Sequence, residues 1–153
     1  MKNTATYVTV RSSSISPLGD ISMDFDKAVA MHVDWKRKLR SYLRNPDYSL
    51  KAAEIAMDDK CELGEWIATK GTTSAHLPEY AALKSNHSNF HKVAADVVRR
   101  ADSGQDVSEE VALGAESEFA SASSAVVLSI LNFVEKIGRT GLPDSSSGAS
   151  LLR

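Results

Sequence analysis

The clearest pattern in the chain is a set of mostly apolar residues spaced three or four apart, which begins after Asp20. That spacing puts side chains on one face of an α-helix. The pattern ends in "RNPDYS", because Pro46 disfavours the helical conformation at Asn45. It therefore predicts a first helix with a histidine on its buried face. The stripe consists of Phe25, Val29, His32, Trp35, Leu39 and Tyr42.

Two further helical pieces follow before the next long helix. The segment "SLKAAEIAM" predicts a second helix, and "DDKCELGEWIATKG" predicts a short one that Gly71 closes. Pro78 suits the first turn of a third long helix, which "DSGQD" stops. Two more histidines share its core face. That stripe consists of Tyr80, Leu83, His87, His91, Ala94 and Val98.

The last helix opens near Ser108 and ends at Gly138 and Gly141. Between Val126 and Ile137 it is apolar almost all round. One stripe packed on its own bundle would leave the remaining apolar side chains exposed, so a second buried face is expected. We predict that this face forms a homodimer.

Together the patterns predict an all-α protein. The expected fold is an antiparallel four-helix bundle, dimeric, with an extra short helix that carries Cys61. Its domain spans residues 20–141, between a flexible extension over 1–19 and a disordered, low-complexity tail over 142–153.

The composition of the chain mainly excludes classes of partner and location. The 153 residues carry 18 Lys and Arg against 20 Asp and Glu, a net charge of −2, so no basic field points to nucleic acid or an anionic membrane. The first residues lack the apolar core of a signal peptide, and no run approaches the ~18 apolar residues of a membrane helix. We expect a soluble, cytoplasmic protein with no nucleic-acid or membrane partner.

Three histidines on core stripes and the single cysteine form a candidate metal set. His87 and His91, four apart on one helix, stand about 6 Å from each other, close enough to bind one ion together. Cys61 begins a helix, whose dipole is expected to lower the thiol pKa and favour thiolate. Three imidazoles and a thiolate suit tetrahedral Zn²⁺. On these residues alone, histidines that merely pack in the core remain a comparable reading.

A family resemblance favours the metal site. "MHVDWKRKLRSYL", "CELGEWI" and "LPEYAALKSNHSNFH" resemble, in order and spacing, the motifs of the chemoreceptor zinc-binding (CZB) domain, and Cys-x-Leu-Gly-x-Trp is the most specific of them. The resemblance implies a helical, often dimeric domain in which three His and one Cys bind zinc. The ligands here would be His32, Cys61, His87 and His91.

Three neighbours of these motifs are candidates for supporting the site. Trp35 and Trp66 are expected to wall it and exclude water, although core packing alone would also explain them. Gly64 either allows another element to approach closely or is a helix glycine with a packing role. His76 lies in a connection and is left out of the site.

Four protein ligands close the zinc shell, whereas catalytic zinc keeps a position open, so no enzyme is expected. "HSNFH" also lacks the glutamate of zinc peptidases. The family places such domains on bacterial chemoreceptors and diguanylate cyclases. This chain shows no recognisable output domain, so the leading hypothesis is a zinc-responsive regulatory protein in chemotaxis or cyclic-di-GMP signalling that acts in trans through a partner. The alternatives are a sensor of oxidants such as hypochlorous acid through zinc-bound Cys61, and a structural scaffold stapled by zinc.

Overall fold

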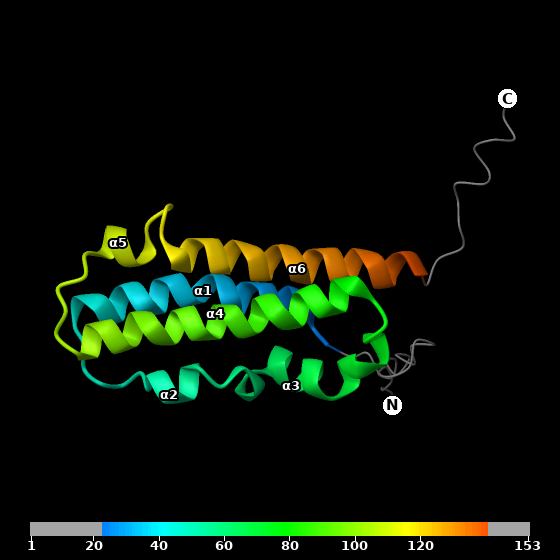
Figure 1. Ribbon diagram of the computed structural model, residues 1–153, viewed down its shortest axis with the longest axis horizontal. Coiled ribbons are helices and arrows are strands. Elements are labelled where there is room, and N and C mark those ends of the chain that lie inside the picture. The colour runs from blue at the N-terminus through cyan, green and yellow to red at the C-terminus, as the bar shows by residue number, and fades with distance from the viewer. Residues whose placement is uncertain (1–22, 141–153) are drawn as a thin grey trace, which may run out of the picture.

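A computed structural model describes residues 23–140, with side chains up to residue 138, and these residues form helices and connections without a strand (Figure 1). The predicted extension over 1–19 and tail over 142–153 lie outside them. The long helices are α1 (Phe25–Arg44), α4 (Pro78–Asp102) and α6 (Glu118–Thr140). The short ones are α2 (Ala52–Ile55), η2 (Asp58–Lys60), α3 (Glu62–Ala68), η3 (Lys70–Ser74) and α5 (Glu109–Leu113). The all-α class is confirmed.

The long helices pack along one another with defined directions. Tyr42 near the end of α1 bonds Asp102 at the end of α4, so these two helices run parallel. Phe133, late in α6, lies 6.5 Å from the ring of Tyr80 near the start of α4, so α6 runs antiparallel to both. The segment from α2 to η3 carries the chain back along α4 (Figure 1). This return is what lets α1 and α4 share a direction.

The predicted four-helix bundle is not confirmed as such, because its second member is a row of short helices. The expected helix in "SLKAAEIAM" is the single turn α2. The backbone turns extended at Met57 and again at Cys61, and each extended residue ends the preceding run of helical hydrogen bonds. The short helix that carries Cys61, in contrast, is present as α3.

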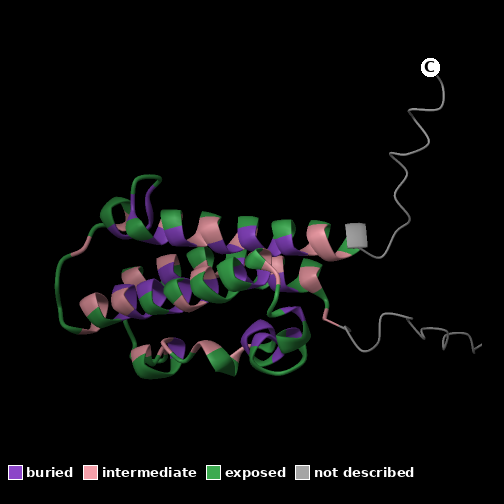
Figure 2. Cartoon of the chain, turned by 45° about the vertical axis from the view of Figure 1, so that its right-hand side comes forward, coloured by how far each residue is buried: buried purple, intermediate pink, exposed green. Residues whose placement is uncertain are grey.

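Local signals in the sequence explain where the long helices start and stop. The side chain of Asp24 accepts a hydrogen bond from Lys27 N at 2.9 Å and so caps α1. Pro78 occupies the first turn of α4, where its missing N–H costs nothing. The buried faces of these helices turn toward a common core (Figure 2). The side chains fully buried there include Leu39, Leu83, Phe90, Phe119, Ile130 and Phe133.

The far face of α6 is partly apolar, as its sequence predicts. Leu128 is 57% exposed and Leu131 is 49% exposed, and Val127 and Val134 beside them are half-buried. The stretch Glu109–Gly138 is also long and apolar enough, by length and composition only, to cross a membrane. This differs from the expectation that no run in the chain is apolar enough to span a membrane. Because core helices pass the same test and α6 packs on α4 and α1, the observation carries little weight.

Candidate metal centre

All three histidines of the candidate set are buried in the bundle. His32 of α1 is 4% exposed, and His87 and His91 of α4 are 2% and 5% exposed. Their positions within apolar stripes require this, because each helix turns its stripe toward the core. Burying three imidazoles is costly unless their nitrogens find partners.

Cys61 is held at the start of α3, half-buried. Its Sγ accepts the backbone N–H of Gly64 at 3.3 Å and thereby caps the helix. A Cβ on Gly64 would lie 1.6 Å from the carbonyl oxygen of Asp58, so only glycine lets η2 pack on the first turn of α3. Of the two readings of Gly64, the close approach is the one observed. It is made by the η2 backbone rather than by another long helix.

The structure brings the four predicted residues together. One ligand atom from each of His32, Cys61, His87 and His91 lies within 4.8 Å of the others. Sγ of Cys61 is 3.2 Å from Nε2 of His87 and 3.7 Å from Nε2 of His91. Two ligands of a tetrahedral zinc, with Zn–S near 2.3 Å and Zn–N near 2.0 to 2.1 Å, stand roughly 3.6 Å apart. The two distances from Cys61 therefore fit zinc.

Hydrogen bonds fix which ring nitrogen faces the site. Nδ1 of His32 lies 2.7 Å from the carbonyl oxygen of Ala28, and Nδ1 of His91 lies 2.7 Å from that of Ile55. A carbonyl only accepts, so in each case Nδ1 carries the proton and donates it. Nε2 of a neutral ring then keeps its lone pair, which is the arrangement of metal-binding histidines.

One of these nitrogens has no partner. Nε2 of His32 is buried, and among the described residues nothing bonds it. A buried polar atom left unsatisfied costs about 1–3 kcal/mol. A metal ion held by the four residues would satisfy it. Trp66 Nε1 and Glu79 Oε2 are also buried without a partner in the described chain, but of these three atoms only Nε2 of His32 belongs to the four-residue cluster, where it favours a ligand set over packed core histidines.

The protonation state of the three histidines also favours binding of a metal cation. Burial, followed by the neighbouring His91 and His32, lowers the pKa of His87 to about 3. Burial likewise lowers the pKa of His32 and of His91. The rings are therefore neutral at pH 7, the form that binds metal.

Cys61 departs from the sequence expectation. Burial raises the pKa of its thiol, and this outweighs the lowering by the backbone N–H groups of α3. The expected drop in pKa at the helix start is wrong for the protein without metal. Coordination itself removes the proton, because a thiol that binds zinc does so as thiolate.

The two tryptophans differ in position. Trp66 is buried in an aromatic cluster, 5.2 Å from the ring of Phe25 and 5.5 Å from that of Phe133. Trp35 is half-buried under the ammonium group of Lys38, 5.1 Å from its ring. Neither makes a ring contact with the histidines among those found in the described chain. A wall role for them stays a prediction.

Phe90, which was not among the predicted site residues, contacts the site. Its ring is fully buried, 5.1 Å from that of His32 and 5.7 Å from that of His91. Its position three residues after His87 on the same helix face was the available signal. Phe90 gives the centre an apolar wall that keeps the imidazoles desolvated.

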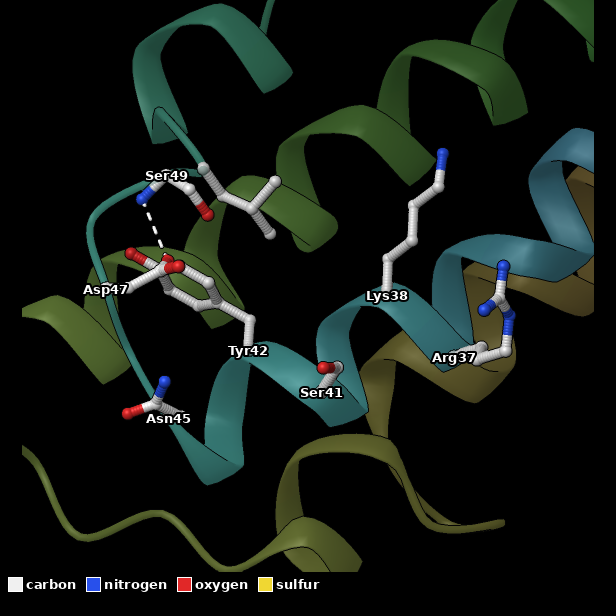
Figure 3. Close-up of a pocket in the computed structure, with 8 residues that line it drawn as sticks. Arg37, Lys38, Ser41, Tyr42, Asn45, Asp47 and Ser49 are labelled. Atoms are coloured by element: carbon white, nitrogen blue, oxygen red, sulfur yellow. Dashed lines mark hydrogen bonds between the residues drawn. The ribbon is translucent and has the colours of Figure 1, made fainter.

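A separate hollow lies away from the centre. A cavity of about 330 Å³ opens between the end of α1 and residues 45–50 (Figure 3). Arg37 and Lys38 at its rim already pair with Asp34. It contains no residue of the metal set.

Fold and site define a helical bundle with a buried cluster of three histidines and one cysteine. Residues 32–98 match the model of a family described as the chemoreceptor zinc-binding domain. The match spans all four clustered residues and confirms the resemblance over this part of the chain. No curated protein and no solved structure matches in the corresponding comparisons. The family and the cluster together support a zinc-binding domain.

Proposed function

We propose that the protein is a regulatory zinc-binding protein in which His32, Cys61, His87 and His91 hold one Zn²⁺. The observation that carries the proposal is Nε2 of His32, buried, unpartnered and within 4.8 Å of the other three ligand atoms. The family match over residues 32–98 supports the choice of metal. Four protein ligands leave zinc no open position, so the protein works by binding and not by catalysis.

The four ligands come from three elements: α1, the start of α3, and α4. Bound zinc would supply a cross-link among them. Structural zinc sites contribute apparent free energies of ~10–16 kcal/mol at neutral pH. Loss of the ion removes one link of α1 and of the α2–η3 segment to α4, while core packing and the Tyr42–Asp102 bond still hold α1 in place, so occupancy changes how firmly the bundle holds the surface it presents. This is how a zinc-binding domain without catalytic residues reports its state.

The downstream role follows from the family's setting on chemoreceptors and diguanylate cyclases. We place the protein in bacterial chemotaxis or cyclic-di-GMP signalling, in the cytoplasm, acting on a partner in trans. Its own state is a homodimer through the exposed face of α6, where Leu128 and Leu131 remain uncovered in the single chain.

Oxidant sensing is the second candidate, and one observation favours it. Cys61 is half-buried whereas the three histidines are buried, so it is the least buried residue of the set. Oxidation of a zinc-bound thiolate weakens its hold on the metal. Release of zinc on titration with hypochlorous acid or peroxide, with Cys61 as the modified residue, supports this role; an inert thiolate contradicts it.

Metal analysis of protein purified without added zinc tests the leading proposal. We expect one zinc per chain and a melting temperature that falls when a chelator is added. Protein that carries no zinc, takes up none and melts unchanged with chelator overturns it. A pull-down compared between zinc-loaded and zinc-free protein separates a regulator, whose partners change, from a scaffold that zinc merely staples.

A further inference from the structure

The imidazole of His32 reaches the metal cluster from α1 with one hydrogen bond to orient it. Its Nδ1 donates to the carbonyl oxygen of Ala28, and its Nε2 has no partner among the described residues. His91 is held at both ring nitrogens, because Nδ1 donates to the carbonyl oxygen of Ile55 and Nε2 lies 3.7 Å from Sγ of Cys61. A single bond leaves the tilt of the His32 ring open, since χ2 of histidine has broad preferences. Packing must therefore supply the rest of its orientation.

The ring of Phe90 packs against the imidazole of His32. Their centroids are 5.1 Å apart and their planes meet at 61°, an edge-to-face arrangement. Phe90 is fully buried, and its ring also lies 5.6 Å from that of Phe119 in α6. Because a close-packed interior leaves little free space, Phe90 cannot shift without moving its neighbours. The edge-to-face contact therefore restricts the tilt of the His32 ring.

The other rings beside His32 belong to the metal set itself. Those of His87 and His91 lie 5.2 Å and 6.0 Å from it. Each of them would bind the same ion, so their positions depend on occupancy together with that of His32. Among the ring contacts of the described chain, Phe90 is the neighbour of His32 that carries no ligand atom. It is thus the contact that can orient His32 before an ion arrives.

We propose that Phe90 is a positioning residue of the metal centre, which holds the imidazole of His32 so that Nε2 faces the other three ligand atoms. A ligand that is already oriented loses little conformational freedom when the ion binds, and affinity rises accordingly. The role belongs to the aromatic ring, because a flexible aliphatic side chain fills the volume without fixing the tilt of its neighbour. The proposal rests on the zinc-binding function proposed above.

Phe90→Leu in the full chain removes the ring and keeps an apolar side chain. We expect zinc affinity, measured by competition with a chromophoric chelator, to fall about tenfold, the lower end of what loss of a partner behind a ligand costs. Co²⁺ bound in place of Zn²⁺ should show weaker visible absorption, because that absorption depends on tetrahedral coordination.

Phe119→Leu is the matched control. Phe119 is also fully buried and touches Phe90, but among the ring contacts of the described residues it touches no histidine. This variant should lose stability in chelator through the same change of side chain, and it should keep both the zinc affinity and the Co²⁺ spectrum of the wild type.

A double-mutant cycle with His32→Ala identifies the residue through which Phe90 acts. If Phe90 works by orienting His32, Phe90→Leu should change zinc affinity little once that imidazole is absent. A general loosening of the core would instead weaken binding by the same factor in both backgrounds.

The outcomes are distinct. Equal losses of affinity in Phe90→Leu and Phe119→Leu overturn the proposal. An unchanged Co²⁺ spectrum in Phe90→Leu, or its full effect on affinity in the His32→Ala chain, also overturns it while the zinc-binding function stands. A wild-type chain that binds neither ion overturns both. Helical circular dichroism confirms folding of each variant, and Phe90→Met, which fills more of the volume without a ring, replaces Phe90→Leu if the latter does not fold.

Discussion

Sγ of Cys61 lies 3.2 Å from Nε2 of His87, although the two residues are 26 positions apart in the chain. The contact exists because the α2–η3 segment runs back along α4 and because Gly64 lets η2 and α3 pack together. Neither residue would bind zinc tightly alone. Their approach converts a helix-borne histidine pair into a closed site.

Replacing Cys61 with alanine removes the only sulfur ligand. We expect zinc affinity to fall by more than the ~10–100-fold that loss of an outer-shell partner costs. The melting temperature in zinc should drop to near its value in chelator. Competition with a chromophoric chelator measures the affinity. An unchanged affinity would show that Cys61 is not a ligand.

His32→Ala is the test of the orphaned nitrogen. Zinc binding should weaken sharply, because α1 supplies no other ligand in the cluster. In chelator, the variant should lose less stability than a core Leu→Ala change of ~2–5 kcal/mol, since an unsatisfied buried atom leaves with the ring. The control is His76→Ala, at an exposed histidine outside the cluster, which should leave zinc binding intact. Equal zinc loss in the two variants would refute the assignment.

Gly64→Ala should destabilise the fold and the site together. Its Cβ would lie 1.6 Å from the carbonyl oxygen of Asp58, so η2 must move, at a cost of about 1–3 kcal/mol for overpacking. The movement displaces Cys61 and lowers zinc affinity. Gly138→Ala is the control: nothing lies within 4 Å of its added Cβ in α6, so a gain of up to ~1 kcal/mol is expected. Urea unfolding measures both. A neutral Gly64→Ala would mean that η2 adjusts freely.

Much of this site followed from residue spacing, and the exceptions have physical causes. The 3.6-residue period placed His32, His87 and His91 on core faces, because a stripe in an amphipathic helix must be buried. It did not show that the return from α1 to α4 is a row of short helices, because the extended backbone at Met57 and Cys61 that interrupts it leaves no mark on the spacing of apolar residues. The failed pKa expectation for Cys61 has a similar origin. A helix start is visible in sequence, but the degree of burial that opposes it is a tertiary property.

The apolar face of α6 gives a prediction about assembly. Leu131→Lys places a charge on a side chain that is 49% exposed in the single chain. If this face forms the homodimer, the variant should sediment as a monomer at concentrations where wild type is dimeric, while helical content is kept. Val111→Lys is the control, at a residue 66% exposed in α5. Wild type that sediments as a monomer, or a dimer unaffected by Leu131→Lys, contradicts the assignment.

Tyr42 and Asp102 should make stability depend on pH at the alkaline end. The hydroxyl of Tyr42 donates to the Asp102 carboxylate at 2.5 Å and ties the end of α1 to that of α4. Burial, followed by this bond and the charge of Asp102, raises the pKa of Tyr42 from 10.0 to about 12. A group whose pKa is raised by folding contributes stability that is fully present below the unfolded pKa. That contribution is therefore lost as pH rises from about 10 through about 12.

Tyr42→Phe removes the donor and leaves the ring. At pH 7 we expect a loss of about 2 kcal/mol, the range of hydrogen bonds to charged groups, and above pH 10 the difference from wild type should shrink. Urea unfolding in chelator between pH 7 and 11 measures it without a contribution from zinc. Tyr48→Phe is the control, because Tyr48 is 61% exposed and should show no such convergence. A constant gap between wild type and Tyr42→Phe at every pH would show that the hydroxyl does not titrate with folding. The same variant should weaken zinc binding slightly if at all, because His32 lies ten residues up α1 and is held there by its own bond to Ala28.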